Sequence, residues 1–188
     1  EAYLCSRRQP KENNELIVNT PQQTFRAALG QFFVKETSTE NLAAARSLIE
    51  RSETAGADLL VLPECIIARK LGMPEWGQKQ AEPLDGPFVS GLREATRGRR
   101  VTVVCTVQAK IANESRYAND LLVIQNGELR LTYQKIHLYD AFRGKESRYA
   151  APGDVLPPVL QIGPFKVGFL TCYDVRFPEM TRALACAG

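Results

Sequence analysis

Asp58-Leu-Leu-Val-Leu-Pro63 is a continuous apolar run, typical of a strand that is buried on both faces. Upstream of it, Thr37-Ser-Thr-Glu40 has the spacing of a capping box and opens an Ala- and Leu-rich stretch, which predicts a helix closed by Gly56. The apolar segment 25–34 before this helix predicts another buried strand. A strand, a helix and a strand in this order form a βαβ unit, so the chain opens as an α/β fold.

Helix and strand signals continue beyond this unit. The expected elements are a helix over about 88–98, a strand from Val101 to Ala109, two strands within 119–136, two strands around Gly163-Pro164, the second of them from Phe165 to Thr171, and a helix from about Pro178. Asn126-Gly127, between the two central strands, is the strongest short-range signal for a hairpin. Hairpins after a βαβ opening indicate a mixed sheet.

The composition is that of a globular chain. The 188 residues are 44% hydrophobic and 24% charged, which excludes a collagen-like, disulfide-dense or disordered protein. No apolar run approaches the ~20 residues that a membrane helix needs, so no membrane partner is expected. The formal charge is +3, and its basic residues are scattered except at Arg97, Arg99 and Arg100, so we expect no nucleic-acid partner.

Cysteine usage and the chain ends bear on compartment and boundaries. Five cysteines without framework spacing and a single histidine favour free thiols and no metal site. A reducing compartment fits this usage, the cytoplasm or else the mitochondrion. Residues 1–23 have few apolar side chains and are expected to form a flexible tail, followed by one domain over 24–188. Because the chain begins at Glu1 and stops soon after its last helix starts, we expect it to be processed or partial.

Two charged residues lie at the ends of predicted buried strands. Glu64 follows the run 58–63 directly. Its carboxylate either turns into solvent or stays at the rim of the sheet, where partial desolvation suits it to proton transfer. Lys135 shares the apolar face of its strand with Leu131 and Tyr133. Its ammonium either reaches solvent at the strand end or is held inward by a carboxylate.

Cys172 is the candidate nucleophile. A cysteine in an apolar strand is usually a core residue, but Cys172 comes after strand 165–171 and before a helix. A strand-to-helix turn can expose the sulfur to backbone N–H groups, and we expect such a turn and a nearby ammonium to lower the thiol pKa from about 8.5. Cys65 lacks this setting, so Cys172 is expected to be the reactive thiol. His137 is either the partner of a Cys–His dyad or a structural hydrogen-bonding group.

Three motifs, in this order, resemble the nitrilase, or carbon–nitrogen hydrolase, superfamily. They are Gly56-Ala-Asp-Leu-Leu-Val-Leu-Pro-Glu64, Tyr133-Gln-Lys-Ile-His-Leu-Tyr139 and Thr171-Cys-Tyr-Asp-Val-Arg-Phe-Pro-Glu179. The resemblance covers Thr24 to Gly188 and is strongest to deaminated glutathione amidases and ω-amidases. It implies an α-β-β-α sandwich, incomplete at the C-terminus because family domains continue beyond the nucleophile helix.

The resemblance also implies a set of catalytic roles. Glu64 is the general base, Lys135 stabilises the oxyanion and Cys172 is the nucleophile; Glu146 supports the lysine, and the backbone N–H of Tyr173 is a second oxyanion donor. The implied reaction hydrolyses a linear, non-peptide amide to a carboxylic acid and ammonia through a thioester, with no metal or organic cofactor. The substrate would be a small amide such as deaminated glutathione or another ω-amide, and the protein a homodimer or higher oligomer.

Two other functions stay open from the sequence. The chain could be a truncated, non-catalytic remnant or interaction module of the same fold, or a Cys–His hydrolase of another fold that uses His137 and leaves Glu64 without a role. Missing strands would expose a sheet edge and apolar surface, so we expect the 188-residue chain alone to be inactive and poorly soluble.

Overall fold

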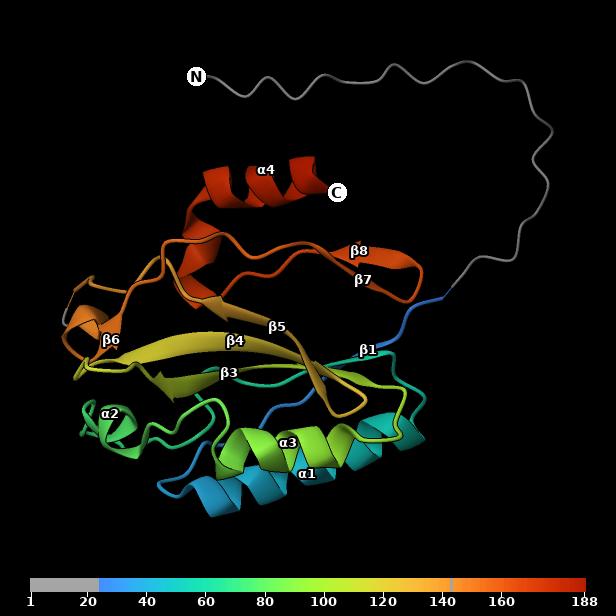
Figure 1. Ribbon diagram of the computed structural model, residues 1–188, viewed down its shortest axis with the longest axis horizontal. Coiled ribbons are helices and arrows are strands. Elements are labelled where there is room, and N and C mark those ends of the chain that lie inside the picture. Colours follow the sequence, from blue (N-terminus) through green and yellow to red (C-terminus); the bar gives the residue numbers. More distant parts are fainter. Residues whose placement is uncertain (1–23, 143) are drawn as a thin grey trace.

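The computed structural model describes residues 24–142 and 144–188, so the predicted tail, residues 1–23, lies outside the described part. The described chain forms four layers: a pair of long helices, a six-stranded sheet, a two-stranded sheet and a last helix (Figure 1). This arrangement confirms the predicted α-β-β-α sandwich. The candidate site residues come from the segment after β2, from the end of β5 and from two short 3₁₀ helices.

The large sheet is mixed, as the sequence predicted. Its strand order is β1-β2-β3-β4-β5, with β6 paired to β4. β1, β2 and β3 are parallel, whereas β3, β4 and β5 are successively antiparallel. The strands are β1 (Ala27–Leu29), β2 (Leu59–Val61), β3 (Thr102–Lys110), β4 (Tyr117–Gln125), β5 (Glu128–Gln134) and β6 (Ala150–Ala151).

One face of the sheet is covered by α1 (Ser38–Thr54) and α3 (Pro87–Thr96) (Figure 1). The N-cap predicted at Thr37 is confirmed, because Glu40 N donates to Thr37 Oγ1. The Glu40 carboxylate accepts from the Thr37 hydroxyl at 2.6 Å, and not from the Thr37 backbone N–H as in a full capping box. Gly56, with φ of 68°, follows the end of this helix as expected. The shorter helix α2 (Trp76–Gln80) lies beside β3.

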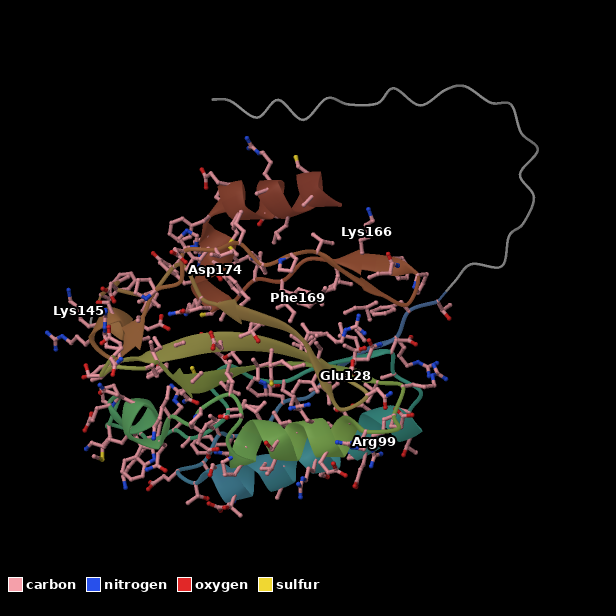
Figure 2. The ribbon with its side chains drawn as sticks, viewed as in Figure 1. Arg99, Glu128, Lys145, Lys166, Phe169 and Asp174 are labelled. Atoms are coloured by element: carbon pink, nitrogen blue, oxygen red, sulfur yellow. The ribbon has the colours of Figure 1, made fainter. Side chains whose placement is uncertain are left out.

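The other face of the large sheet packs against the C-terminal part of the chain, which forms the two-stranded sheet and the last helix. This part consists of the hairpin β7 (Leu160–Ile162) and β8 (Phe165–Val167), the 3₁₀ helix η2 (Cys172–Arg176) and α4 (Pro178–Ala187); a further 3₁₀ helix, η1 (Glu146–Arg148), precedes β6. A second apolar core lies between the sheets, to which Leu121, Tyr133, Phe169 and Met180 contribute. Phe169 lies between the large sheet and α4 (Figure 2).

Two predicted strands are shorter than the sequence suggested. The strand expected over 25–34 is confined to Ala27–Leu29 and is not buried, since Leu29 is 83% exposed. Further on, the backbone N–H and C=O of Lys35 bond to the Asn41 side chain. The strand expected over 165–171 ends at Val167, where the pairing with β7 ends. Thr171 N instead donates to the carboxylate of Asp174.

Candidate active site

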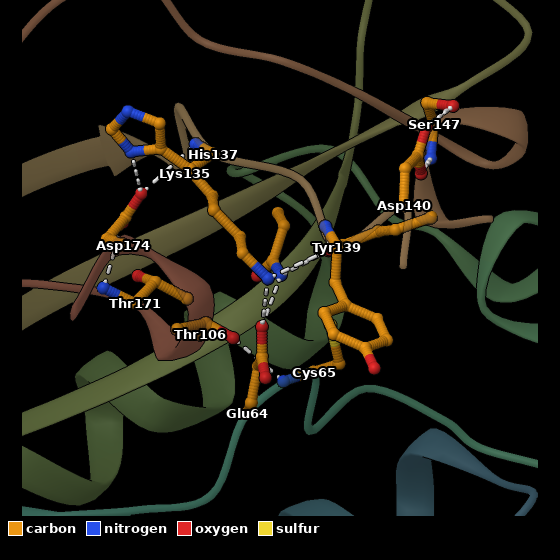
Figure 3. A network of polar contacts seen from close by, with 12 residues as sticks. Glu64, Cys65, Thr106, Lys135, His137, Tyr139, Asp140, Ser147, Thr171 and Asp174 are labelled. Carbon is orange, nitrogen blue, oxygen red and sulfur yellow. Dashed lines mark hydrogen bonds and ion pairs between the residues drawn. The ribbon is translucent and has the colours of Figure 1, made fainter. Parts of the chain in front are cut away.

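Lys135 lies between two carboxylates at the end of β5 (Figure 3). Its Nζ is 3.0 Å from Glu64 Oε1, at the end of the segment after β2, and 2.9 Å from Glu146 Oε2, in η1. The Lys135 side chain is only 2% exposed. Of the two alternatives that the sequence left open, the ammonium is therefore the one held inward.

The electrostatics keep this lysine charged. Burial disfavours the ammonium, but the negative charges and hydrogen bonds of Glu64 and Glu146 outweigh it and raise the pKa of Lys135 above its ordinary value. Glu64 remains one-third exposed, so its carboxylate is at the rim of the sheet and in contact with the cavity. A fixed cation beside a partly exposed carboxylate can stabilise developing negative charge while the carboxylate moves a proton.

Asn119 is a site residue that the sequence reasoning missed. Its Nδ2 donates to Glu64 Oε1 at 2.8 Å and to Glu146 Oε1 at 3.3 Å, and the residue is fully buried in β4. Glu146 also accepts a hydrogen bond from the backbone N–H of Tyr139, at 2.7 Å from Glu146 Oε2, in addition to those from Lys135 and Asn119. The available signal was an amide inside an otherwise apolar strand, because a buried amide needs hydrogen-bond partners.

Cys172 opens η2 and has an exposed side chain. Its φ of 46° lies in the left-handed region, which costs free energy for a residue with a Cβ and is typical of functional turns. Cys172, Glu64, Lys135 and Glu146 all line one cavity of about 490 Å³. The structure thus brings the predicted residues together, while their catalytic roles stay a prediction.

The expected lowering of the thiol pKa is wrong. Burial first, and then the negative charge of Glu64, raise the pKa of Cys172, and the ammonium of Lys135 only partly opposes them. The thiol therefore keeps its proton in the free protein and needs a base to become a nucleophile. Glu64 is the adjacent carboxylate that interacts with it.

Cys65 shares the cavity but differs in reactivity. Burial, followed by the charge of Glu64, raises the pKa of the Cys65 thiol to about 12. Its backbone N–H donates to Thr106 Oγ1 at 2.7 Å, which fixes the turn after Glu64. Cys65 is therefore the less reactive thiol of this cavity.

His137 is bound to Asp174. Its Nδ1 lies 2.8 Å from Asp174 Oδ1, and its ring stacks on Phe177 with 3.6 Å between ring centroids. His137 is not among the residues that line the cavity. This placement favours the structural alternative over a Cys–His dyad.

Aromatic rings pack next to Cys172, at the start of η2. Tyr173, next to Cys172, packs edge-on against Tyr139 and Phe177, with centroid distances of 5.2 and 5.6 Å. Edge-to-face pairs of this kind restrict the positions of their rings. η2 is therefore held by side-chain packing as well as by hydrogen bonds.

Comparison with known proteins defines the class. Residues 26–188 match the carbon–nitrogen hydrolase family, and the chain belongs to that family. Across residues 24–142 and 144–188, none of the helices has the length and apolar character that crossing a bilayer requires. In the same residues no group of three His, Cys, Asp or Glu side chains is placed to hold a metal ion.

Individual relatives are amidases. The chain is 35% identical over 161 residues to deaminated glutathione amidase of Escherichia coli O157:H7, covering 86% of the chain and 61% of that protein. It is 29% identical to omega-amidase NIT2 of Xenopus tropicalis, covering 87% and 60%. A solved mutant of the amidase of Nesterenkonia sp. AN1, with acrylamide added to its active-site cysteine, has a TM-score of 0.74 and 29% identity, covering 86% and 63%. The chain thus spans about three fifths of the length of these relatives.

Proposed function

We propose that the protein hydrolyses a small, linear amide to a carboxylic acid and ammonia through a thioester on Cys172. The observation that carries this proposal is the cavity in which the thiol of Cys172 lies with the ion-paired Glu64, Lys135 and Glu146. The raised pKa of Cys172 explains why a neighbouring carboxylate is needed. Membership of the carbon–nitrogen hydrolase family supports the same reaction class.

In the first half-reaction Cys172 Sγ attacks the amide carbon while Glu64 takes the thiol proton. The carbonyl oxygen becomes an oxyanion, for which Lys135 Nζ and the backbone N–H of Tyr173 are the donors. Each such donor is typically worth ~3–4 kcal/mol in the transition state. As the carbon–nitrogen bond breaks, Glu64 passes its proton to the leaving nitrogen, and ammonia departs.

In the second half-reaction Glu64 removes a proton from water, and the hydroxide oxygen attacks the thioester carbon. The same donors hold the second oxyanion. When the carbon–sulfur bond breaks, the carboxylic acid leaves and the proton returns from Glu64 to sulfur. In this scheme Glu146 and Asn119 keep Glu64 and Lys135 in place through their hydrogen bonds.

We further propose that the substrate carries a carboxylate at the end remote from the amide, as ω-amides and deaminated glutathione do. Two exposed cations, Arg69 and Lys145, line the cavity. Lys70 also lines it, but this ammonium is held by Glu36 at 2.7 Å and lies over the Trp76 ring. Arg69 and Lys145 are therefore the cations with which a bound carboxylate would pair.

Ammonia release by the full-length protein tests both proposals. We expect succinamate to be hydrolysed faster than butanamide, its uncharged analogue, and Cys172→Ala to release no ammonia from either. Because a hydrogen bond to a charged group is worth about 1.5–3 kcal/mol, Arg69→Ala should raise KM for succinamate by roughly tenfold or more and leave butanamide unaffected. Lys70→Ala is the matched control and should change neither KM beyond about twofold.

Other outcomes separate the alternatives. Full turnover by Cys172→Ala would reject the thioester, and an inactive wild-type protein against a panel of amides would favour a non-catalytic module. Equal KM values for charged and uncharged amides would reject carboxylate recognition while leaving amide hydrolysis intact.

We also propose a homodimer or higher oligomer in a reducing compartment such as the cytoplasm. Val175, in η2 next to the site, is 64% exposed, and an apolar side chain in that position supports a contact with a second subunit. Cys65, Cys105 and Cys172 are all thiols rather than disulfides. Light scattering of the full-length protein measures the assembly directly; a monomer at micromolar concentration would contradict it.

A further inference from the structure

Asp174 is a fully buried carboxylate that does not line the cavity. Its Oδ2 accepts from Tyr133 Oη at 2.8 Å and from Thr171 N at 3.0 Å. Its Oδ1 accepts from His137 N at 3.0 Å and lies 2.8 Å from His137 Nδ1 (Figure 3). Both oxygens of one buried charge are thus occupied by groups from two separate parts of the chain.

The first of these parts is the turn that carries the nucleophile. Asp174 belongs to η2, as Cys172 does, and it holds the N–H of Thr171, the residue before Cys172. Cys172 adopts a left-handed φ of 46°, so its conformation depends on contacts at its flanks. The hydrogen bond from Thr171 to the Asp174 carboxylate is such a contact.

The second part is the end of β5, which carries Lys135. Tyr133 and His137, two residues before and two after Lys135, both bond to Asp174. Tyr133 Oη also accepts from Ile136 N at 3.1 Å, which curls the segment around its hydroxyl. Burial raises the pKa of Tyr133, and the hydrogen bond to Asp174 adds to this, so the hydroxyl stays a donor.

We propose that Asp174 is a positioning residue that sets the distance between Cys172 and Lys135, and so aligns the nucleophile with the oxyanion donor. The inference rests on the roles proposed above for those two residues. Charge-assisted hydrogen bonds from buried donors are among the stronger and more directional contacts in proteins. Misplacing a catalytic group by about 1 Å can cost roughly a hundredfold in rate, so fixing this distance matters for turnover.

Only two titratable groups contact the Asp174 carboxylate, the Tyr133 hydroxyl and the His137 ring, among the described residues. The opposite view is that Asp174 merely stabilises the fold. The two views predict different reaction rates for variants that lose the same amount of stability. Replacing a residue that only stabilises the fold lowers the melting temperature and leaves the rate of the folded protein unchanged. Replacing a positioning residue slows the chemical steps.

Asp174→Asn in the full-length protein is the first variant. Whichever way the amide turns, its NH₂ faces a backbone N–H, of Thr171 or of His137, so one of the two links is lost. We expect kcat to fall by at least about thirtyfold with KM changed less than about threefold, because the substrate cavity is left intact. Addition of acrylamide to Cys172, followed by mass spectrometry, should slow by at least about tenfold.

Ile49→Ala is the matched control. Ile49 is fully buried in α1, in the core on the other face of the large sheet from Tyr133 and Met180. This variant should lower the melting temperature at least as much as Asp174→Asn while kcat stays within about twofold of wild type. If Asp174→Asn does not fold, Tyr133→Phe removes one donor and keeps the ring, with an expected loss of about three- to tenfold in kcat.

A double-variant comparison separates positioning from a general effect. In a Lys135→Met background there is no oxyanion lysine to align, so adding Asp174→Asn should slow hydrolysis by less than about threefold. The proposal is overturned if folded Asp174→Asn and Tyr133→Phe react with acrylamide as fast as wild type, or if the loss in kcat is the same with and without Lys135. The acrylamide reaction needs no amide turnover, so it decides the proposal even if amide hydrolysis itself is not found.

Discussion

Lys135 Nζ hydrogen-bonds to both oxygens of the Glu146 carboxylate, at 3.1 and 2.9 Å. These two hydrogen bonds hold the ammonium in place, and Glu64 Oε1, at 3.0 Å, is its second carboxylate partner. Two carboxylates and one ammonium give the cluster a net charge of −1. In the proposed reaction the oxyanion forms next to Lys135 and shares this cation with the two carboxylates. Because the ammonium is already in position, it does not have to move during the reaction.

Lys135→Met should abolish most of the activity and also weaken the fold. Removing an oxyanion donor costs roughly 10²–10³ in kcat. Removing the cation also leaves Glu64 and Glu146 without their counter-charge, which typically costs about 3–5 kcal/mol for a buried pair. Lys135→Met/Glu146→Gln should recover part of the stability in urea unfolding but none of the activity. Activity within tenfold of wild type in Lys135→Met would contradict the role of this lysine.

Glu64→Gln should separate thiol reactivity from hydrolysis. The charge of Glu64 raises the pKa of Cys172, so removing that charge stabilises the thiolate and shifts the alkylation of Cys172 by iodoacetamide toward lower pH. Hydrolysis of an amide should fall by roughly 10²–10⁴ because the base is gone. Peptide-resolved mass spectrometry measures the alkylation. Glu114→Gln, which alters a surface carboxylate paired with Arg116, is the control and should leave the profile unchanged.

Gly153→Ala should disturb the strand end that carries Lys135. Gly153 N donates to Lys135 O at 2.9 Å, and a Cβ on Gly153 would collide with the backbone carbonyl of Gln134. Overpacking of this kind typically costs about 1–3 kcal/mol, and here the backbone that must shift positions the ammonium, so kcat should fall with stability. In Gly168→Ala the added methyl meets Leu184 Cβ at 3.3 Å, so α4 must shift by a few tenths of an ångström while the backbone around Lys135 is not contacted. That control should keep its activity.

Asp120 should make the fold less stable as pH rises from about 4 to 6. Burial raises the pKa of Asp120 from 3.8 to about 6, so in this range the folded state holds a proton that the unfolded state has released. Asp120→Asn removes this penalty and should be more stable than wild type at pH 7 by up to about 3 kcal/mol, with little difference at pH 3. Urea unfolding at the two pH values measures the change; equal differences at both would contradict it.

Asp140→Asn is the control of opposite sign. Hydrogen bonds from Ser147 lower the pKa of Asp140, so this carboxylate stabilises the fold above its unfolded pKa and loses that contribution as pH falls through its folded pKa. Its replacement should weaken the fold at pH 7, and by less as the pH falls below the ordinary pKa of an aspartate.

The layered fold follows from short-range signals in the sequence. The N-cap at Thr37, the apolar run before Glu64 and the Asn126-Gly127 turn each specify a local structure that tertiary packing keeps. The strand ends were less predictable, because side chains from neighbouring turns and helices take up the backbone groups there. Residue 35 bonds to the Asn41 side chain, and Thr171 bonds to Asp174, and no periodicity in the sequence reports either bond.

The reactive groups of the site were predictable from the sequence, whereas the residues that hold them in place through hydrogen bonds were less so. Glu64 and Lys135 follow β2 and β5 of the large sheet, Cys172 follows the segment after β8 of the small sheet, and the packing of the two sheets brings them to the same cavity. Asn119 and Asp174 lack that signal. Asn119 bonds to Glu64 and Glu146, 55 and 27 positions away, and Asp174 bonds to Tyr133 and His137, 41 and 37 positions away. The raised pKa of Cys172 was also beyond the sequence, because it depends on how deeply the thiol lies beside Glu64.

Intact-protein mass spectrometry of the full-length protein, quenched with acid during turnover of succinamate, tests the central claim most directly. The proposed route predicts an added mass equal to the acyl group, located on the peptide that contains Cys172 and absent from Cys172→Ala. In Glu64→Gln acylation itself is slow because the proposed base is missing, so we expect no build-up of the acyl adduct. An acyl adduct on Cys65, or one that persists in Cys172→Ala, would contradict the assignment of Cys172 as the nucleophile.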